Sequence, residues 1–203
     1  QAHRVALGDR RYDAPMMRRT AVAQAREWST VVFVAVVVAA LVRTFVFQQF
    51  YIAGPSMETT LAGDDRVLVN KLALRMGDVG RGDVVVFDRV TTNGSAVQHD
   101  DLIKRVIALS GETVEIRGCT VRVDGRELPE PWLPAADASQ DDLVARCGQP
   151  DMDPVRVPDG SVFLMGDNRP MSFDSRQFGP VALDAVVGEA FVVIWPPSHW
   201  SGL

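Results

Sequence analysis

The sequence predicts a mainly β protein in which a single N-terminal transmembrane helix precedes an antiparallel β-sheet domain with a loop-rich insertion. Two observations predict this fold class. Residues 28–47 form the most apolar stretch of a 203-residue chain whose net charge is −5. After that stretch, short β-branched runs alternate with Gly and Asp, and no long segment keeps the helical period of 3.6 residues. The acidic charge provides no basic footprint for nucleic acid, so we expect no nucleic-acid partner.

The apolar stretch is long enough to cross a membrane. As a helix, about 20 residues span roughly 30 Å, the thickness of the hydrocarbon core of a bilayer. No polar side chain interrupts residues 31–42, and Arg43 lies near the end, where its long side chain can reach the interface. A cleavable signal peptide would be shorter and followed by small residues, but Phe45 and Phe47 are bulky. A core helix of a soluble protein would rarely be so rich in valine, so we expect an uncleaved anchor.

The charges before the anchor predict its orientation. Residues 1–27 contain six arginines and three acidic residues. Positive segments stay in the cytoplasm, so the body of the chain should lie on the other side of the cell membrane. The sequence therefore predicts a single-pass protein with a cytoplasmic basic segment (1–27), an anchor (28–47) and an extracytoplasmic β domain (48–203).

Strands are expected where β-branched runs are bounded by turn residues. After the strand that ends at Val123, Asp124-Gly125 suits a type I′ hairpin turn. Residues 129–160 contain six of the 12 prolines and many aspartates, which indicates an insertion or subdomain of about residues 113–160. The expected strands are 66–69, 83–87, 113–117, 121–123, 161–165 and 190–195, with a further one around residue 104.

The two cysteines, Cys119 and Cys147, both lie on the side predicted to be exported. An oxidising compartment favours a disulfide between them, although two free thiols remain the alternative. The histidines, His3, His99 and His199, are scattered and have no ligand spacing. We therefore expect neither a metal site nor a cofactor.

Lysine is rare in this chain, because only Lys71 and Lys104 are found among the 21 cationic residues. Where charge alone is needed the chain uses arginine, so a lysine can serve to lose its proton, which arginine does not do. Read as a strand, the face of Lys104 also carries Leu102, Val106 and Ala108. Burial there would lower the pKa of the amine from about 10.4 by roughly two to three, which would make a useful base. We expect Lys71 to be a surface residue.

Two further segments could complete a site. Ser56 follows Gly54-Pro55, a turn that can present a hydroxyl, and roughly nine residues after Phe47 reach at most about 30 Å, so Ser56 should lie near the membrane. The polar segment 166–176 follows an apolar run. It is either a loop closed by an ion pair between Asp174 and Arg176, or a polar shell whose Ser172 hydroxyl orients the lysine amine.

Four segments together resemble the conserved boxes of the type I signal peptidases, a family of serine proteases with a Ser/Lys dyad. The segments occur in the family's order, after an anchor in the family's place. The resemblance implies a membrane-bound endopeptidase that removes signal peptides from exported preproteins, with small residues before the cut. It also implies membrane lipid and the secretion translocon as partners, and no cofactor. The four segments are Ser56–Leu61, Arg81–Phe87, Ile103–Ile107, and Gly166–Asn168 with Ser172 and Asp174–Arg176.

The resemblance also implies the role of each residue. Ser56 attacks and forms an acyl-enzyme, and neutral Lys104 takes its proton. Ser172 orients Lys104, and the backbone amide of Ser56 stabilises the oxyanion. The supporting ion pairs come from Arg105, Asp167, Asp174 and Arg176, and the candidates for the substrate-binding and oxyanion positions are Ile52, Gly54, Leu61, Leu102 and Ile103. The chain departs from the family at Gly54, where some members have a serine, and at Thr59, where proline is usual and a looser turn with retained activity is expected.

Three other interpretations remain at this point. A self-cleaving Ser/Lys repressor of the LexA type would need a DNA-binding domain in place of the anchor. A membrane-tethered binding domain without catalysis fits the acidic body and the disulfide. A cysteine transpeptidase using Cys119 would need a partner histidine or arginine, which the sequence does not show.

Overall fold

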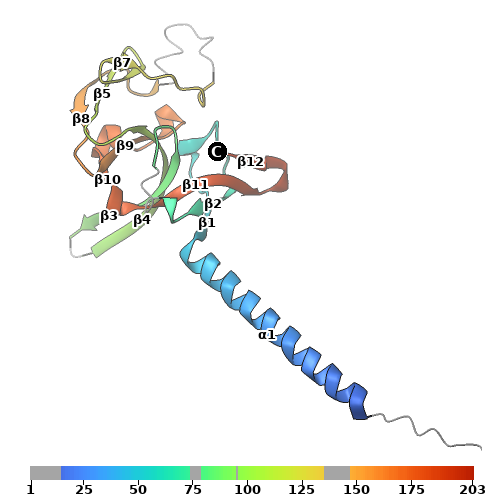
Figure 1. The fold of residues 1–203 in the computed structure, drawn as a ribbon. Coiled ribbons are helices and arrows are strands. Elements are labelled where there is room, and N and C mark those ends of the chain that lie inside the picture. Colours follow the sequence, from blue (N-terminus) through green and yellow to red (C-terminus); the bar gives the residue numbers. More distant parts are fainter. Residues whose placement is uncertain (1–14, 74–78, 95, 135–146) are drawn as a thin grey trace, which may run out of the picture. The chain divides into compact units, whose positions relative to one another are not determined.

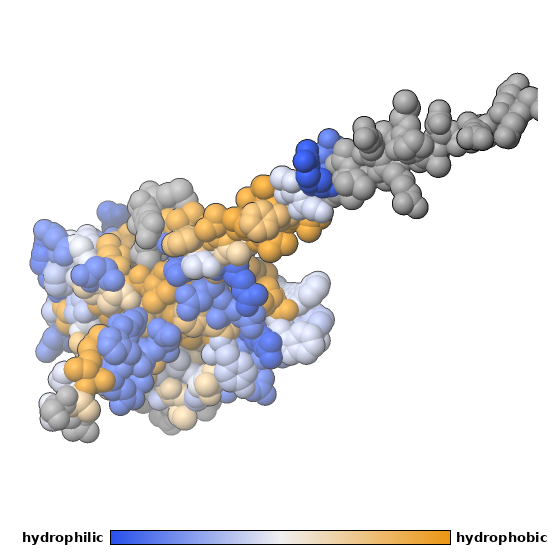
Figure 2. All heavy atoms as spheres, turned by 90° about the horizontal axis from the view of Figure 1, so that it is seen from below, coloured by the Kyte–Doolittle hydropathy of each residue, from blue (hydrophilic) through white to orange (hydrophobic). Residues whose placement is uncertain are grey.

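The computed structural model describes residues 15–73, 79–94, 96–134 and 147–203. The chain forms two compact units, residues 1–43 and residues 44–203 (Figure 1). Helix α1 (Pro15–Phe45) carries the apolar stretch, and its part Arg26–Phe45 is long and apolar enough to cross a membrane. Figure 2 shows that the described part of this helix changes from hydrophilic to hydrophobic along its length. The helix ends at Phe45, and Phe47, expected to be the last residue of the anchor, begins the first strand.

The larger of two antiparallel sheets has eight strands. Along the sheet their order is β1-β2-β11-β3-β4-β9-β10, and β12 pairs with β11. Two long strands, β3 and β4, form a hairpin in which Val85 pairs with Lys104. The strands are β1 (Phe47–Tyr51), β2 (Arg66–Asn70), β3 (Val84–Asn93), β4 (Ala96–Ala108), β9 (Ser161–Met165), β10 (Val181–Ala182), β11 (Val186–Trp195) and β12 (Ser201–Gly202).

A second, four-stranded sheet lies within the predicted insertion. Its order is β7-β6-β5-β8, formed by β5 (Thr113–Arg117), β6 (Thr120–Val123), β7 (Arg126–Glu127) and β8 (Met152–Arg156). Short helical turns complete the described body: η1 (Pro55–Met57), η3 (Arg169–Met171), α3 (Ser175–Phe178), η4 (Leu183–Ala185) and η5 (Pro197–His199). An apolar helix followed by a mainly antiparallel β domain confirms the predicted fold class.

Most predicted strands are present, and the predicted hairpin turn has the expected geometry. Asp124 and Gly125 have φ values of 51° and 74°, the positive values that a type I′ turn requires. Strand β8 was not predicted, because Asp153 and Pro154 obscure its pattern. Part of the region predicted to be rich in loops, residues 135–146, lies outside the described residues.

Strand β4 contributes side chains to three apolar clusters, and a register shift near its end changes the direction in which its last side chains point. Leu102 and Val106 pack in a cluster with Val85, whereas Ala108 packs with Ile107 against the small sheet. The pairing of β4 with β9 shifts register between Val106 and Ala108. A β-bulge changes which way the following side chains point. The predicted face of Lys104 therefore ends at Val106, and the inclusion of Ala108 was wrong.

Candidate active site

Ser56 lies in the short helical turn η1. Gly54 precedes the turn in an extended conformation with φ −117°, and Pro55 occupies its first position. Proline suits that position because its missing N–H would have no partner inside the helix. Met57 is fully buried, so the turn is held against the apolar cluster while the half-buried Ser56 remains near the surface.

Lys104 lies on β4, beside the point where the neighbouring strand β9 ends. The pairing of β9 with β4 begins at Arg105, next to Lys104. Only 3% of Lys104 is exposed, yet its Nζ lies 2.8 Å from Ser56 Oγ and donates to the carbonyl of Ile103 at 2.8 Å. The fold therefore brings a hydroxyl and an amine that are 48 residues apart within hydrogen-bond distance.

Burial lowers the pKa of Lys104 from 10.5 to about 8, while the negative charges of Asp174 and Asp167 act in the opposite direction. Burial disfavours the ammonium because a charge loses its hydration in an apolar environment. At pH 7, about one-tenth of the amines with a pKa of 8 are neutral, against roughly one in three thousand at the ordinary value. The site therefore supplies a base near neutral pH.

The loop after β9 packs closely on Ser56. A Cβ atom on Gly166 would lie 2.3 Å from Ser172 Oγ and 2.4 Å from the carbonyl oxygen of Ser56, so no larger residue fits there. The amide of Asn168 donates to the same carbonyl at 3.0 Å. The Ser172 hydroxyl is buried and has no hydrogen-bond partner among the described residues, so the expected bond from Ser172 to Lys104 is not formed.

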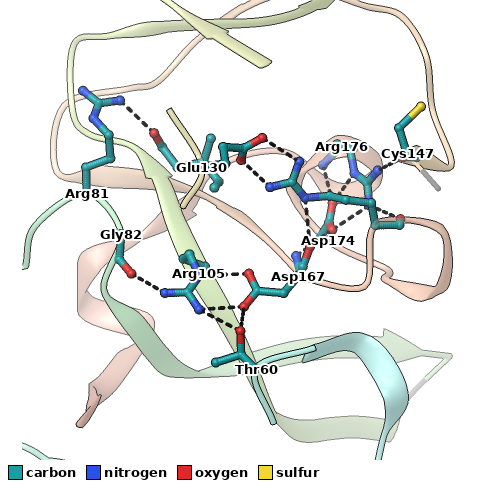
Figure 3. Close-up of polar contacts among 12 residues, drawn as sticks. Thr60, Arg81, Gly82, Arg105, Glu130, Cys147, Asp167, Asp174 and Arg176 are labelled. Atoms are coloured by element: carbon teal, nitrogen blue, oxygen red, sulfur yellow. Dashed lines mark hydrogen bonds and ion pairs between the residues drawn. The ribbon is translucent and has the colours of Figure 1, made fainter. Parts of the chain in front are cut away.

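Two buried ion pairs support this loop (Figure 3). Arg105 binds Asp167 with two bonds, Nε to Oδ1 at 2.9 Å and Nη2 to Oδ2 at 2.6 Å. Arg176 binds Asp174 in the same way, with both bonds at 2.9 Å, and Asp174 also accepts from the amide of Gly166 at 3.0 Å. Two parallel bonds fix the orientation of each carboxylate, so these pairs hold both ends of the loop in place.

The candidate substrate residues separate into two groups. Ile52 and Leu61 are buried in one apolar cluster with the partly buried Ile103, whereas Leu102 packs in another cluster. Gly54 has open space where a side chain would be.

Lys71, expected at the surface, is half-buried at the end of β2, and its Nζ reaches the carbonyl of Thr44 at 3.5 Å.

Thr59 has a backbone conformation that the usual proline of the family could not adopt. Its φ is 98°, whereas the proline ring holds φ near −65°. The next residue, Thr60, donates its hydroxyl to Asp167 Oδ2 at 2.5 Å and accepts from Arg105 Nη2 at 3.2 Å. The departure from the family's proline therefore lies directly beside the Arg105–Asp167 pair.

Three residues beside the ion pairs were missed by sequence reasoning. Glu130 binds Arg169 through both carboxylate oxygens, and the Arg105 guanidinium lies 4.8 Å from the ring centre of Trp132. Glu130 and Trp132 belong to the insertion and follow no local pattern that points to the site. Arg169 lies inside the polar segment 166–176, and only its place there could have indicated a role.

Cys119 and Cys147 form a disulfide, with their Cα atoms 5.6 Å apart. The carbonyl of Cys147 accepts a hydrogen bond from Arg176 Nη1 at 3.0 Å, so the disulfide lies next to the supporting ion pairs. A bridged Cys119 has no free thiol to act as a nucleophile. The interpretation as a cysteine transpeptidase was therefore wrong.

A serine hydroxyl beside a buried amine of lowered pKa, in a chain with an apolar anchor helix, defines the class of membrane-anchored serine peptidases. Comparison with known proteins identifies the family within that class. The family described as "Signal peptidase, peptidase S26" matches residues 25–195. The chain therefore belongs to the signal peptidase I family, whose members are serine peptidases that cleave signal peptides from secreted preproteins.

Two signal peptidases known from their sequences agree with this assignment. Signal peptidase I of Mycobacterium tuberculosis (strain ATCC 25618 / H37Rv) is 35% identical over 86% of this chain and 74% of its own length. Signal peptidase I T of Bacillus subtilis (strain 168) is 37% identical over 84% of this chain and 85% of its own length. A crystal structure of a signal peptidase I from Enterococcus faecalis V583 shares 32% identity, covers 55% of this chain and 95% of that one, and has a TM-score of 0.44.

The family assignment also decides between the remaining alternatives. A LexA-type repressor and a binding domain without catalysis were both wrong, because the matched family consists of signal peptidases and the match spans both the anchor and the β domain. The chain is a membrane-anchored enzyme, and its substrates are preproteins that carry signal peptides.

Proposed function

We propose that Ser56 is the nucleophile of this signal peptidase and that neutral Lys104 is its general base. The observation that carries this proposal is the 2.8 Å separation of Lys104 Nζ and Ser56 Oγ at an amine that is 3% exposed. Hydrogen-bond distance allows direct proton transfer, and burial keeps a useful fraction of the amine neutral. Arginine could not replace this lysine, because guanidinium stays protonated.

The reaction divides into two steps. Ser56 Oγ forms a bond to the scissile carbonyl carbon while its proton passes to Lys104 Nζ. The C–N bond then breaks, Lys104 returns the proton to the leaving amine, and the signal peptide remains as an ester on Ser56. Lys104 next takes a proton from water, the hydroxide oxygen attacks the ester carbonyl, and the proton returns to Ser56 as its oxygen leaves.

The surroundings of the pair would orient it for these steps. The carbonyl of Ile103 accepts one N–H of the amine, so the lone pair of a neutral Lys104 can face the Ser56 hydroxyl. Ser56 belongs to the first turn of η1, where backbone amides have no partner inside their own helix. Its amide is therefore suited to stabilise the oxyanion of the tetrahedral intermediate. Because Gly54 has no side-chain hydroxyl, only its backbone or a water molecule could assist in stabilising the oxyanion at that position.

The supporting ion pairs would protect the neutral amine. The negative charges of Asp167 and Asp174 raise the pKa of Lys104, against the larger effect of burial. Arg105 and Arg176 bind these carboxylates with two bonds each, so part of their negative charge is compensated. Without the arginines, the carboxylates would favour the ammonium form and remove the base. Ser172 would act here by packing against Gly166 rather than by bonding to Lys104.

The signal peptide would bind beside the free edge of β4. Residues 102–104 pair with β3 on one side, while on the other side the pairing with β9 begins only at Arg105. An extended peptide can add to such an edge through backbone hydrogen bonds. The apolar side chains of Ile52, Leu61 and Ile103 would then limit the space for the residues before the cut, which favours small ones.

We further propose that the enzyme is a single-pass protein of the cell membrane, with residues 1–27 in the cytoplasm and the β domain outside it. The excess of arginine before the anchor supports this orientation. The secretion translocon would deliver preproteins to the β domain, and lipid would contact the anchor. Chemical labelling of single cysteines placed on either side of the anchor tests the orientation.

Two variants test the proposed chemistry. Ser56→Ala and Lys104→Ala, prepared as the full chain in lipid vesicles, should each lose cleavage of a precursor whose cut site is mapped. An acylating probe of serine peptidases should label the wild type but not Ser56→Ala. Cleavage by Ser56→Ala at more than one-tenth of the wild-type rate would overturn the assignment of the nucleophile.

A further inference from the structure

The insertion contributes a tight turn to the buried surroundings of the dyad. In this turn, residues 130–133, the amide of Leu133 donates to the carbonyl of Glu130 at 3.0 Å. From this turn, Glu130 binds Arg169 and Trp132 contacts Arg105. We call this turn the clasp. Neither residue belongs to the boxes that resemble the family.

Trp132 covers one face of the Arg105 guanidinium. The guanidinium carbon lies 4.8 Å from the ring centre, close enough for a cation–π interaction. In its own plane Arg105 donates to Asp167, to Thr60 and, at 2.7 Å, to the carbonyl of Gly82. A Cβ atom on Gly82 would come within 3.4 Å of the Trp132 ring, so the indole fits closely between these two residues. The ring therefore keeps water from the face of a charge that is 4% exposed.

Glu130 holds the other arginine. Both of its carboxylate oxygens bind Arg169, which is 6% exposed and donates through Nε to the carbonyl of Gly166 at 3.1 Å. Gly166 is the residue on which Ser172 and the carbonyl of Ser56 pack. A chain of contacts therefore runs from Glu130 through Arg169 and Gly166 to the nucleophile.

We propose that Trp132 and Glu130 are positioning residues for peptide-bond cleavage: Trp132 keeps the Arg105–Asp167 pair dry, and Glu130 fixes the loop that packs against Ser56. This inference rests on the proposed roles of Ser56 and Lys104. Removing the ring should also change the electrostatic surroundings of Lys104, the residue before Arg105 on β4. Water beside Arg105 weakens its hold on Asp167, so more of the negative charge of that carboxylate acts on Lys104 and raises the pKa of the amine. The charged groups near Lys104 are Asp167 and Asp174, each with its arginine, Arg105 and Arg176.

The test compares pH–rate profiles of full-chain variants in lipid vesicles. Trp132→Ala should move the limb on which the rate rises with pH by about one pH unit to the alkaline side, a roughly tenfold loss of kcat at neutral pH. Trp132→Leu, which keeps apolar volume without a ring face, should move it in the same direction and serves if the alanine variant does not fold. Trp132→Phe should keep a profile close to that of the wild type, because it keeps an aromatic face for Arg105, and the indole N–H that it removes has no partner among the described residues.

Val155→Ala is the matched control for packing. Val155 is partly buried against the same apolar cluster as Trp132, so its truncation should lower stability and leave the profile in place. Glu130→Gln should lower kcat about fivefold with little change in KM, since it loosens the loop without touching the substrate. An unchanged limb in both Trp132→Ala and Trp132→Leu would overturn the role of Trp132, and a wild-type kcat in Glu130→Gln would overturn that of Glu130. Ser56→Ala separates the two levels: if it is inactive while the clasp variants behave as wild type, only the clasp is wrong.

Discussion

Lys104 and Arg105 are consecutive residues on β4, and both side chains are almost fully buried, but their surroundings are opposite. Arg105 donates to Asp167, Thr60 and Gly82 and is covered by the ring of Trp132. Lys104 has one hydroxyl, one carbonyl and no carboxylate within hydrogen-bond distance among the described residues. The first region stabilises a charge, whereas the second disfavours one.

The difference shows how one strand can hold a structural cation beside a chemical base. Arginine presents a planar set of donors that matches a carboxylate and is charged at any relevant pH. Lysine loses its proton readily when its ammonium is desolvated. Because Arg105 compensates the negative charge of Asp167, this carboxylate has less influence on the pKa of Lys104. The two regions are therefore complementary parts of one site.

The largest expected loss of activity comes from replacing Lys104 by arginine, which makes the two neighbouring residues alike. Lys104→Arg should reduce kcat/KM by about a thousandfold or more, because a guanidinium cannot accept the proton of Ser56. Lys71→Arg is the matched control, since it makes the same change at the other lysine and should keep activity. Cleavage assays on a precursor with a mapped cut site measure both. Comparable activity in the two variants would mean that Lys104 acts only through its charge.

A change on the arginine side should act mainly on stability. Asp167→Asn leaves the buried charge of Arg105 without a counter-ion, which should lower the free energy of unfolding by about 3 kcal/mol. Asp153→Asn removes a carboxylate from an exposed pair with Arg117 and should change stability by less than about 0.5 kcal/mol. Chemical denaturation in detergent compares the two. Equal effects would show that the Arg105–Asp167 pair does not stabilise the fold.

A smaller, pH-dependent effect is expected when the charge of Lys104 is removed. Because folding lowers this pKa from 10.5 to about 8, the unfolded chain binds more protons between these pH values, and wild-type stability should rise through that window. Below pH 8 the full cost of burying the ammonium is present, on the order of 3 kcal/mol. Lys104→Met should therefore be more stable than the wild type by about 1–3 kcal/mol at pH 7, because lost hydrogen bonds offset part of the gain. Thermal unfolding of both proteins across pH 6–10 should show this advantage shrinking above pH 8.

Much of this site could be predicted from the sequence, because its main signals are local. The anchor is one unbroken apolar stretch, and most strands are short runs of β-branched residues between turns. Lys104 was conspicuous because lysine is rare in the chain, and Ser56 because it follows a Gly-Pro turn. The resemblance to ordered family boxes then indicated that these two residues meet.

The remaining features depend on contacts between distant segments. The bulge between Val106 and Ala108 arises where β9 pairs with β4, and no residue type in β4 indicates its position. Glu130 is 39 residues from Arg169, and only the tertiary fold brings them together. A serine in the polar segment suggested a hydrogen bond to Lys104, but its position beside Gly166 follows from packing that the sequence does not encode locally.

The most direct test of the account is to measure the proton equilibrium of Lys104 itself. Because the chain has only two lysines, side-chain isotope labelling of lysine gives two resonances, and the Lys71→Arg variant leaves one to follow by NMR in detergent micelles. The account predicts that this resonance titrates with a midpoint near pH 8. A midpoint near 10.5, the ordinary value for lysine, would mean that the amine is charged at neutral pH and would contradict its role as the base.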